Sequence, residues 1–440
     1  MTRLGVDGDK NERGPNVLVQ TRSRSILGCL ETRKFVYLSS QFFLKCQSNI
    51  VNLNSPCINS ILALTEFIAA NNTASLSLLK YFTNNERDDF VVSTFTAQAL
   101  ISLVKLGAKG LTHDQIHTAF ETPLQPDYIK YAMKTLLPQF LHNKNFFLQL
   151  GARIFAPLDT TIKQEFTLVA EKIFFIEVKQ LDFQKPEAAA VAINVWVQQQ
   201  TNKKIQEVIV PTGIKPTTKM LLVDAVYVSG AWTKPFQKNQ TVKSQFYKTP
   251  DDVVTAEMMG TCERFFYCES ETLDAKFLKM SILGSTAFMV VVLPNKRDGL
   301  KALEQKVEDL LVEQKLNLTL VDVNLPKFRV ETRSSFVPVL RQVRVSQAFE
   351  TMANFSEISE KEQLCVDDVV QSAVVEIHER GIGQPRRVHK AGIVEDRGAA
   401  NGASLKRESF IADHPFLFYV SAEDIILFVG GFWLPKYFEK

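Results

Sequence analysis

The sequence predicts an α+β fold, and two observations lead to that prediction. Helical patterns gather in the first half of the chain, whereas long β-branched and aromatic runs dominate the second half. Elements segregated in this way are typical of α+β folds rather than of alternating α/β folds. The chain also holds 32 Phe residues, many in strand-like runs, so a large β-rich core can form.

Apolar residues at helical spacing predict the helices. The pattern over Thr96–Leu106 stops before Gly107, a residue that commonly follows a helix. The same spacing predicts a long amphipathic helix over Ala188–Val208, with Ile193, Trp196 and Val197 inward. Further helices are predicted over His113–Phe120, Pro126–Phe140, Ile162–Phe175, Leu300–Leu311 and Arg333–Val343.

Runs of β-branched and aromatic residues between turn signals predict the strands. They cover Met220–Val228, Arg264–Tyr267, Ala287–Leu293, Leu320–Val330, Leu364–Ile377, Phe416–Val420 and Ile425–Gly430. Several of these runs are apolar at every position, so we expect their sheets to be covered on both faces.

Composition excludes several classes of protein. Of the 440 residues 45% are hydrophobic, and the net charge is only +3, which is unlike a disordered chain. No apolar run approaches the ~18 residues of a membrane-spanning helix, and the chain is not basic enough overall to predict a nucleic-acid partner. The phosphate-binding, serine-hydrolase and zinc-protease motifs are absent, so we predict neither an enzyme nor a cofactor.

Cysteine and histidine give weak signals. The six cysteines form no CxxC pair, and Cys262 and Cys268 either bridge a turn or, as we prefer, remain buried free thiols. His113 and His117 stand four residues apart and could share a metal ion. The sequence shows no third ligand nearby, so we interpret them as surface histidines and predict no metal site.

Residues 1–70 are unlike the rest and are interpreted as an N-terminal leader or extension, followed by one domain over residues 73–440. Within the leader, residues 58–70 resemble a signal-peptide core displaced inward, with cleavage near Ala70; the alternative is an amphipathic lead-in helix. We predict a secreted, extracellular protein, with an intracellular one as the alternative. Secretion would make glycosylation sites of Asn71, Asn239, Asn317 and Asn354.

The most informative stretch lies near the C-terminus. A strong strand ending at Glu379 is followed by about 30 residues with no helical period and no long apolar run. Loops of this length in compact domains are usually functional or disordered. From Arg380 to Arg407 there are seven Lys/Arg against Glu395 and Asp396, a local charge of +5. Composition alone fits a solvated insertion without a role equally well.

From about Thr73 to the end, the chain resembles the serpins. The matching motifs are Leu106–Thr112, Ile193–Val197 with Thr201–Ile205, Ala225–Phe236, Met258–Met259, Leu325–Phe328, Ala348–Phe349, Asn354–Ser356 and Ala412–Phe418. The resemblance implies three β-sheets, about nine helices and a monomer with an exposed reactive loop at about residues 380–407. Such a loop baits a serine protease and, once cut, inserts into the main sheet as a new central strand.

The position of the scissile bond depends on where the family's spacing is counted from. Counting forward from Gly381 gives Glu395–Asp396 or Arg397–Gly398, whereas counting back from Ala412 gives the range 402–404. We prefer Arg397–Gly398, because a basic side chain suits a trypsin-like protease.

The loop hinge departs from the family pattern, in which small apolar residues follow the first turn. Its residues are Glu379, Gly381, Ile382, Gly383, Gln384, Pro385, Arg386 and Arg387. Pro385 has no N–H for a central strand, and either Arg386 or Arg387 would be buried on insertion. The alternative is therefore a non-inhibitory serpin, acting as a binding or carrier protein or as a protease substrate. The basic loop also suggests a polyanion partner.

The resemblance implies that two further sets of residues lie along the route by which the cut loop enters the sheet. Trp232 and Lys327 belong to the breach, the end where the loop enters, and Lys327 is the expected ionic partner of Glu379. Ser93, Thr96, Asp224 and Gln371 belong to the shutter, the gate deeper in the sheet. Asp224 and Gln371 replace a typical Asn and His, and they could still hydrogen-bond each other.

Overall fold

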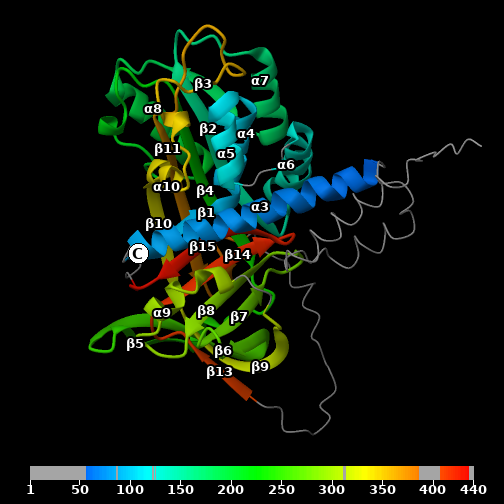
Figure 1. Ribbon diagram of the computed structural model, residues 1–440. Helices are drawn as coiled ribbons and strands as arrows, with labels where there is room; N and C mark the ends of the chain where they lie inside the picture. Colours follow the sequence, from blue (N-terminus) through cyan, green and yellow to red (C-terminus); the bar gives the residue numbers. More distant parts are fainter. Residues whose placement is uncertain are drawn as a thin grey trace, which may run out of the picture.

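A computed structural model describes residues 56–85, 88–120, 123, 125–310, 314–385 and 407–435. Within these residues the chain forms eight α-helices and fifteen β-strands, and the strands make two sheets. Most of the helices gather around the six-stranded sheet, and the nine-stranded sheet fills the opposite end of the molecule (Figure 1). The predicted α+β class is therefore observed.

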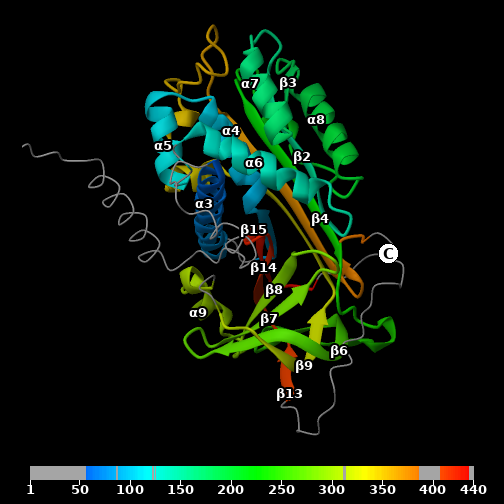
Figure 2. The ribbon, with the colours of Figure 1, turned by 90° about the vertical axis from the view of Figure 1, so that its right-hand side faces the viewer.

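The six-stranded sheet carries the candidate site. Its order is β10 (Phe328–Ser335), β11 (Asp368–His378), β12 (Gly381–Ile382), β4 (Leu221–Ala231), β2 (Phe146–Pro157) and β3 (Glu177–Leu181). Helix α8 (Pro186–Gln200) packs on one face and α4 (Thr94–Leu106) lies on the other (Figure 2). Because both faces are covered, β4 is buried from Leu221 to Gly230, as its unbroken apolar run predicts.

The nine-stranded sheet joins what the family resemblance counts as two sheets. Its strands are β1 (Phe90–Ser93), β15 (Ile425–Phe432), β14 (Phe416–Ala422), β8 (Phe288–Pro294), β7 (Ala275–Ser281), β6 (Asp252–Ser270), β9 (Asn317–Pro326), β13 (Arg407–Ile411) and β5 (Thr241–Thr249). β6 is 19 residues long and pairs with β5 along its first half and with β7 at its end. This strand connects the two parts, so the described strands form two sheets instead of three.

The remaining helices are α3 (Pro56–Asn85), α5 (Gly110–Phe120), α6 (Pro126–Leu141), α7 (Gln164–Val169), α9 (Leu300–Glu304) and α10 (Val337–Gln342). Several predicted boundaries were wrong. The helix predicted from Arg333 begins at Val337, because Arg333–Ser335 pair with β11 as the end of β10, and the helix predicted from Leu300 to Leu311 ends at Glu304. The helix predicted to reach Val208 ends at Gln200, and the left-handed backbone at Asn202 and Lys203 cannot continue a helix. The strand predicted over Leu320–Val330 is split at Lys327 into β9 and β10.

The N-terminal segment differs from its prediction. Residues 58–70, expected to lie outside the fold, form the first half of the 30-residue helix α3. Ala63, Phe67 and Ala70 are buried, and the Phe67 ring packs edge-on against Phe95 with centroids 6.5 Å apart. The lead-in helix interpretation describes this packing, and the predicted boundary near Thr73 falls inside the helix.

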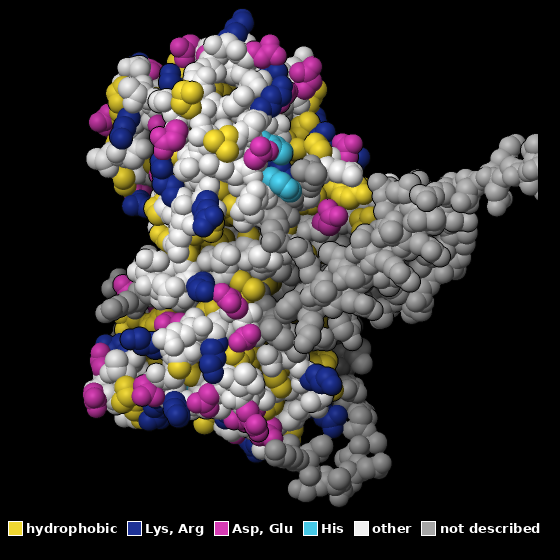
Figure 3. All heavy atoms as spheres, in the orientation of Figure 1, with side chains coloured by type: hydrophobic (Ala, Val, Ile, Leu, Met, Phe, Trp, Pro, Cys, Tyr) yellow, Lys and Arg dark blue, Asp and Glu magenta, His cyan; other side chains and the backbone are white. Residues whose placement is uncertain are grey.

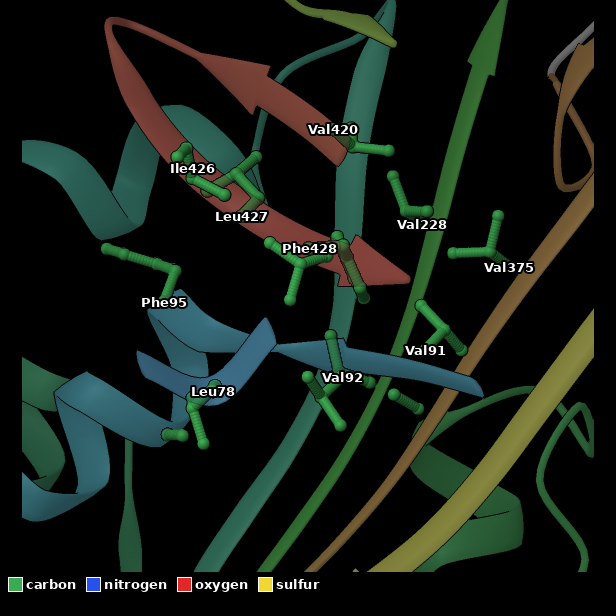
Figure 4. Close-up of a cluster of buried hydrophobic side chains, with 14 of the residues drawn as sticks. Leu78, Val91, Val92, Phe95, Val228, Val375, Val420, Ile426, Leu427 and Phe428 are labelled. Atoms are coloured by element: carbon green, nitrogen blue, oxygen red, sulfur yellow. The ribbon is translucent and has the colours of Figure 1, made fainter. Parts of the chain in front are cut away.

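The main core lies where the two sheets meet. Val91 and Val92 of β1 and Phe428 of β15 pack close to Val228 of β4 and Val375 of β11 (Figure 4). β1 pairs with β15, and α4 begins directly after it, so this short strand links the nine-stranded sheet to the helix under the six-stranded one. β4 and β11 therefore both contribute side chains to the largest apolar cluster.

The surface in Figure 3 carries Lys/Arg and Asp/Glu side chains interspersed, without a single dominant sign. Among the described residues, no helix is both long and apolar enough to cross a membrane.

Candidate functional site

The start of the predicted reactive loop already forms a strand of the six-stranded sheet. β12 lies antiparallel between β11 and β4, with Ile382 level with Ile377 and Gly230. The Ile382 side chain is fully buried in the main core. A Cβ at Gly381 would collide with the Gly230 carbonyl oxygen, so only glycine fits there.

The chain leaves the sheet at Gly383. Its φ of +65° lies in the left-handed region that favours glycine, and a Cβ would collide with the Tyr227 hydroxyl. The Gly383 N–H donates to the Glu376 carbonyl at 2.7 Å, and the Gly383 carbonyl is hydrogen-bonded to the His378 ring, so two bonds still tie the hinge to β11 here. Gln384 is exposed and Pro385 is half-buried.

Beyond this point β11 and β4 pair directly with each other. Their parallel register matches Val374 with Tyr227, and Gln371 with Asp224 further along. The sheet is thus open at the level of Ile382 and closed from Val374 onward, and a longer inserted strand has to separate these pairs.

The breach holds a buried carboxylate beside a lysine. Glu379 is 6% exposed, and its Oε1 lies 3.4 Å from Lys327 Nζ and accepts a 3.1 Å bond from the Thr241 hydroxyl. Lys327 also lies 3.3 Å from Glu257. Burial alone would raise the pKa of Glu379, but a backbone N–H, the Lys327 charge and the Thr241 hydroxyl outweigh it and lower that pKa. The pair that the resemblance implies is present in the structure.

Trp232 fixes the turn between β11 and β12. Its indole N–H donates to the His378 carbonyl at 3.0 Å, and its backbone N–H donates to the Arg380 carbonyl at 2.9 Å. Phe236 completes the anchor, because its N–H donates to the Glu379 carbonyl at 2.9 Å. Three carbonyls of the turn are therefore satisfied by the segment that follows β4.

The shutter joins β1, α4 and β11. Ser93 caps α4, and its hydroxyl donates to the Leu427 carbonyl at 2.9 Å. Gln371 binds both backbone groups of Ser93: its Oε1 accepts from the N–H at 2.7 Å, and its Nε2 donates to the carbonyl at 2.9 Å. Thr94 donates its hydroxyl to the Ile426 carbonyl at 3.0 Å.

Asp224 completes the shutter from β4. Its Oδ2 accepts bonds from the Thr96 hydroxyl at 2.5 Å and from the Gln371 amide at 2.6 Å. Its Oδ1 is buried and accepts no hydrogen bond, and no described Lys or Arg contacts the carboxylate. Burial raises the pKa of Asp224 to about 6, although the two hydrogen bonds act in the opposite direction. Sequence reasoning predicted the bond to Gln371 but not the unpaired oxygen.

The far end of the loop is held in the other sheet. β13 begins at Arg407 and pairs in parallel with β9, and Arg407 lies 2.8 Å from Asp322. The predicted hinge residues Arg386 and Arg387 and the scissile pair Arg397 and Gly398 lie outside the described residues.

Three of the four predicted glycosylation positions, Asn239, Asn317 and Asn354, are exposed. Asn71 is wholly buried in α3, and its amide donates to the Ile426 carbonyl at 2.8 Å. A glycan does not fit at Asn71 in this fold, so that candidate site is excluded by packing.

The predicted cysteine and histidine sites have simple outcomes. Cys262 and Cys268 are free thiols on the same strand, roughly 20 Å apart, so they cannot bridge each other. Cys262 is exposed, contrary to the prediction of two buried thiols. The His113 and His117 rings lie 6.2 Å apart, and no group of three or more metal-binding side chains occurs in the described part of the chain.

The family comparison agrees with this geometry. The model of the family described as "Serpin (serine protease inhibitor)" matches residues 69–435. The match covers most of the chain, so the protein belongs to the serpin family, whose members are protease inhibitors rather than enzymes.

Named insect proteins are among its relatives. The chain is 30% identical over 358 residues to alaserpin of Manduca sexta, covering 79% of this chain and 88% of that protein. It is 27% identical over 361 residues to antichymotrypsin-2 of Bombyx mori, covering 79% and 92%. The solved structure of Serpin48 of Tenebrio molitor, described as a highly specific serpin, superposes with a TM-score of 0.78 and 30% identity over 84% of this chain and 98% of that one.

Proposed function

We propose that this protein inhibits a serine protease by offering its reactive loop as bait and inserting the cut loop between β11 and β4. The observation that carries the proposal is β12, because two residues of the loop are already paired with both of these strands. Extending this pairing would add a central strand and replace direct β11–β4 contacts with two new ladders. The trapping of the protease requires that insertion be faster than release of the cut chain.

The hinge slows this step but does not forbid it. Continuing the observed register places Pro385 level with Val374 and Tyr227. The Gly383 N–H donates toward β11, and alternate residues of a strand point the same way, so Pro385 would lack one bond to β11. One missing backbone bond costs about 1 kcal/mol, which is small compared with the ladders gained.

A gel experiment tests inhibition directly. The protein is mixed with trypsin-like proteases, and the expected product is a covalent complex that survives SDS. The rival function, a binding protein or a substrate without inhibition, predicts clean cleavage in the loop, no complex and no gain in thermal stability. That result would refute the inhibitory proposal.

Arg397 is the bait residue in this proposal, and the target is a trypsin-like protease. Arg397→Ala should abolish complex formation with such a protease, whereas Lys406→Ala, at the end of the same basic loop, should leave it intact. Mass spectrometry of the released peptide identifies the cut bond, and a cut elsewhere in the loop would move the bait away from Arg397.

The basic loop is also proposed to bind a polyanion. Arg380 is exposed at its beginning, and the loop carries the local charge of +5. Retention on heparin should fall with rising salt and should be lost when Arg386, Arg387 and Lys390 are changed to Gln. Retention that survives these changes would exclude the loop as the binding surface.

We further propose that the protein is a secreted monomeric glycoprotein. The support is the exposure of Asn239, Asn317 and Asn354, each in an N-x-[ST] sequence. Expression in insect cells should yield monomer in the medium whose mass falls on deglycosylation. Retention of the whole product inside the cells, without glycan, would contradict the proposal.

A further inference from the structure

His378 binds the backbone on both sides of the short strand β12. Its Nδ1 accepts a 3.2 Å hydrogen bond from the Arg380 N–H, and its Nε2 is hydrogen-bonded to the Gly383 carbonyl. The side chain is half-buried at the end of β11, on the residue that pairs with Gly381. One side chain therefore closes the turn at which the loop enters the sheet.

These two bonds fix the position of the proton on the ring. A backbone N–H only donates, so Nδ1 has to accept and carries no hydrogen. A backbone carbonyl only accepts, so Nε2 has to carry the hydrogen. The hinge in this arrangement thus requires neutral His378. A second proton, on Nδ1, would face the Arg380 N–H, and two donors cannot bond each other.

The carboxylates near His378 are already paired with cations, so they offer little stabilisation to a second proton. The charged groups that act on the ring are Glu379, Glu376 and Arg380. Glu376 binds two cations at 2.8 and 3.1 Å, and Glu379 lies 3.4 Å from a third. These cations are Lys204 from the segment after α8, Arg329 of β10, and Lys327 between β9 and β10.

Burial opposes protonation of His378. It lowers the pKa of the ring and outweighs the Gly383 carbonyl and the two carboxylates, which favour the cation, while Arg380 acts in the same direction as burial. The Tyr227 hydroxyl beside Gly383 stays neutral, because burial raises its pKa.

A ring released from the turn would have the ordinary histidine pKa of 6.5. As pH falls below that value, the released hinge takes up a proton that the paired hinge does not. The equilibrium between the two therefore moves toward release at acid pH.

We propose that neutral His378 is a positioning residue that holds Gly381 and Ile382 between β11 and β4, and that its protonation releases them. The inference rests on the proposed function, in which this short strand is the starting point of insertion. Trapping of the protease should therefore be favoured above pH 7, and cleavage without trapping should gain as the solution becomes acid.

Amide hydrogen exchange of the uncut, full-length protein tests the release directly. Exchange is followed by mass spectrometry at pH 7.5 and 5.5 and is corrected for the intrinsic effect of pH. In the natural sequence, the protection of the peptide covering residues 376–383 should fall by about threefold or more on acidification. The fall cannot exceed about tenfold, because the lower pH lies one unit below the ordinary pKa of histidine.

His378→Gln removes the titrating group and keeps a donor for the Gly383 carbonyl. Protection of the same peptide in this variant should be equal at the two pH values. His142→Gln, at the exposed end of α6, is the matched control and should keep the full change. Asp224 also titrates in this range, but it is present in all three proteins, so the comparison removes its contribution.

The same three proteins are then mixed with a trypsin-like protease at both pH values, and the trapped and cleaved fractions are measured. Relative to His378→Gln, acidification should lower the trapped fraction of the natural sequence and of His142→Gln by about threefold or more. The protease's own response to pH is common to all three mixtures, so this ratio isolates the hinge.

The exchange and trapping results separate this inference from the proposed function. Protection that does not vary with pH in the natural sequence would overturn the inference, as would an unchanged pH dependence in His378→Gln. If a protease is trapped but protection does not vary with pH, the proposed function stands and this inference falls. If protection depends on His378 but no protease is trapped at either pH, the positioning role stands and the inhibitory function falls.

Discussion

A buried carboxylate lies at each end of the path between β11 and β4, and among the described residues only one of the two has a neighbouring cation. At the breach, Glu379 lies beside Lys327 and the strands are parted by β12. At the shutter, Asp224 has no cation within the described residues and the strands are closed. The comparison indicates that the sheet is open where its buried carboxylate has a cation and closed where its buried carboxylate has none among the described residues. An incoming strand therefore meets a paired carboxylate first and an unpaired one second.

The largest effect on protease trapping is expected from adding a methyl group at Gly381, where the loop enters the sheet. Gly381→Ala places a Cβ against the Gly230 carbonyl oxygen and within 2.9 Å of Ala231 Cα, so β12 cannot stay paired with β4. We expect at least a tenfold fall in the fraction of protease trapped, equivalent to about 1.4 kcal/mol or more of strain. Gly213→Ala, whose nearest neighbour is Ile209 at 3.4 Å, is the control. Equal trapping by both variants would show that β12 is not the starting point of insertion.

The charge balance at the breach is tested by removing its cation. Lys327→Met leaves Glu379 buried next to Glu257 with no lysine between them. We expect a loss of about 2 kcal/mol in the free energy of unfolding, measured by urea denaturation at pH 7. Lys301→Met on α9, where the lysine is exposed, should change little. A breach variant as stable as this control would mean that Trp232 and the backbone hold the turn without the ion pair.

The buried Asp224 carboxylate at the shutter has no cation beside it within the described residues, so we expect the stability of the fold to fall as pH rises. An ordinary salt-bridged acid has the opposite effect on stability. Burial raises the pKa of Asp224 from 3.8 to about 6, so its favourable contribution is present at low pH and lost as pH rises through 6. Between pH 5 and 7.5 the uncut natural protein should lose about 1–2 kcal/mol of stability relative to Asp224→Asn. A difference that does not vary with pH would mean that Asp224 is charged throughout this range at no cost.

The smallest effect on stability is expected from a half-exposed ion pair at the edge of the six-stranded sheet. Arg333 of β10 pairs with Glu207 at 2.8 Å, and both side chains are about half exposed. Solvent and salt screen such pairs, so Arg333→Gln should cost less than about 0.5 kcal/mol in the same urea experiment. A cost as large as that of Lys327→Met would remove the distinction between buried and peripheral charges on which the comparison rests.

Much of the fold was predictable because local patterns and family motifs agree. The helix ending before Gly107 is present, and Ile193, Trp196 and Val197 are inward as their spacing indicates. β6 was predicted only over Arg264–Tyr267, since charged residues such as the exposed Glu257 and the half-buried Glu263 interrupt the apolar run. Strands exposed on one face give a weaker sequence signal than buried ones.

The residues that form the site were predictable from the sequence, but the pairing of the first loop residues with the sheet was not. The resemblance paired Glu379 with Lys327 and brought Asp224 to Gln371, and both contacts are present. That Gly381 and Ile382 already lie in the sheet was not predictable, because a two-residue strand has no periodicity of its own. Its existence depends on the separation of β11 and β4, which is a tertiary property.

The long helix α3 has a consequence for the order of events in biosynthesis. The peptide bond after Ala70 lies in the middle of a helical segment in which Ala70 and Asn71 are both buried. A processing enzyme needs an accessible, extended stretch of chain, so any removal of the first 70 residues has to occur before this helix docks. A chain that completes folding first keeps Ala63 and Phe67 in its core and carries its N-terminal segment for the rest of its lifetime.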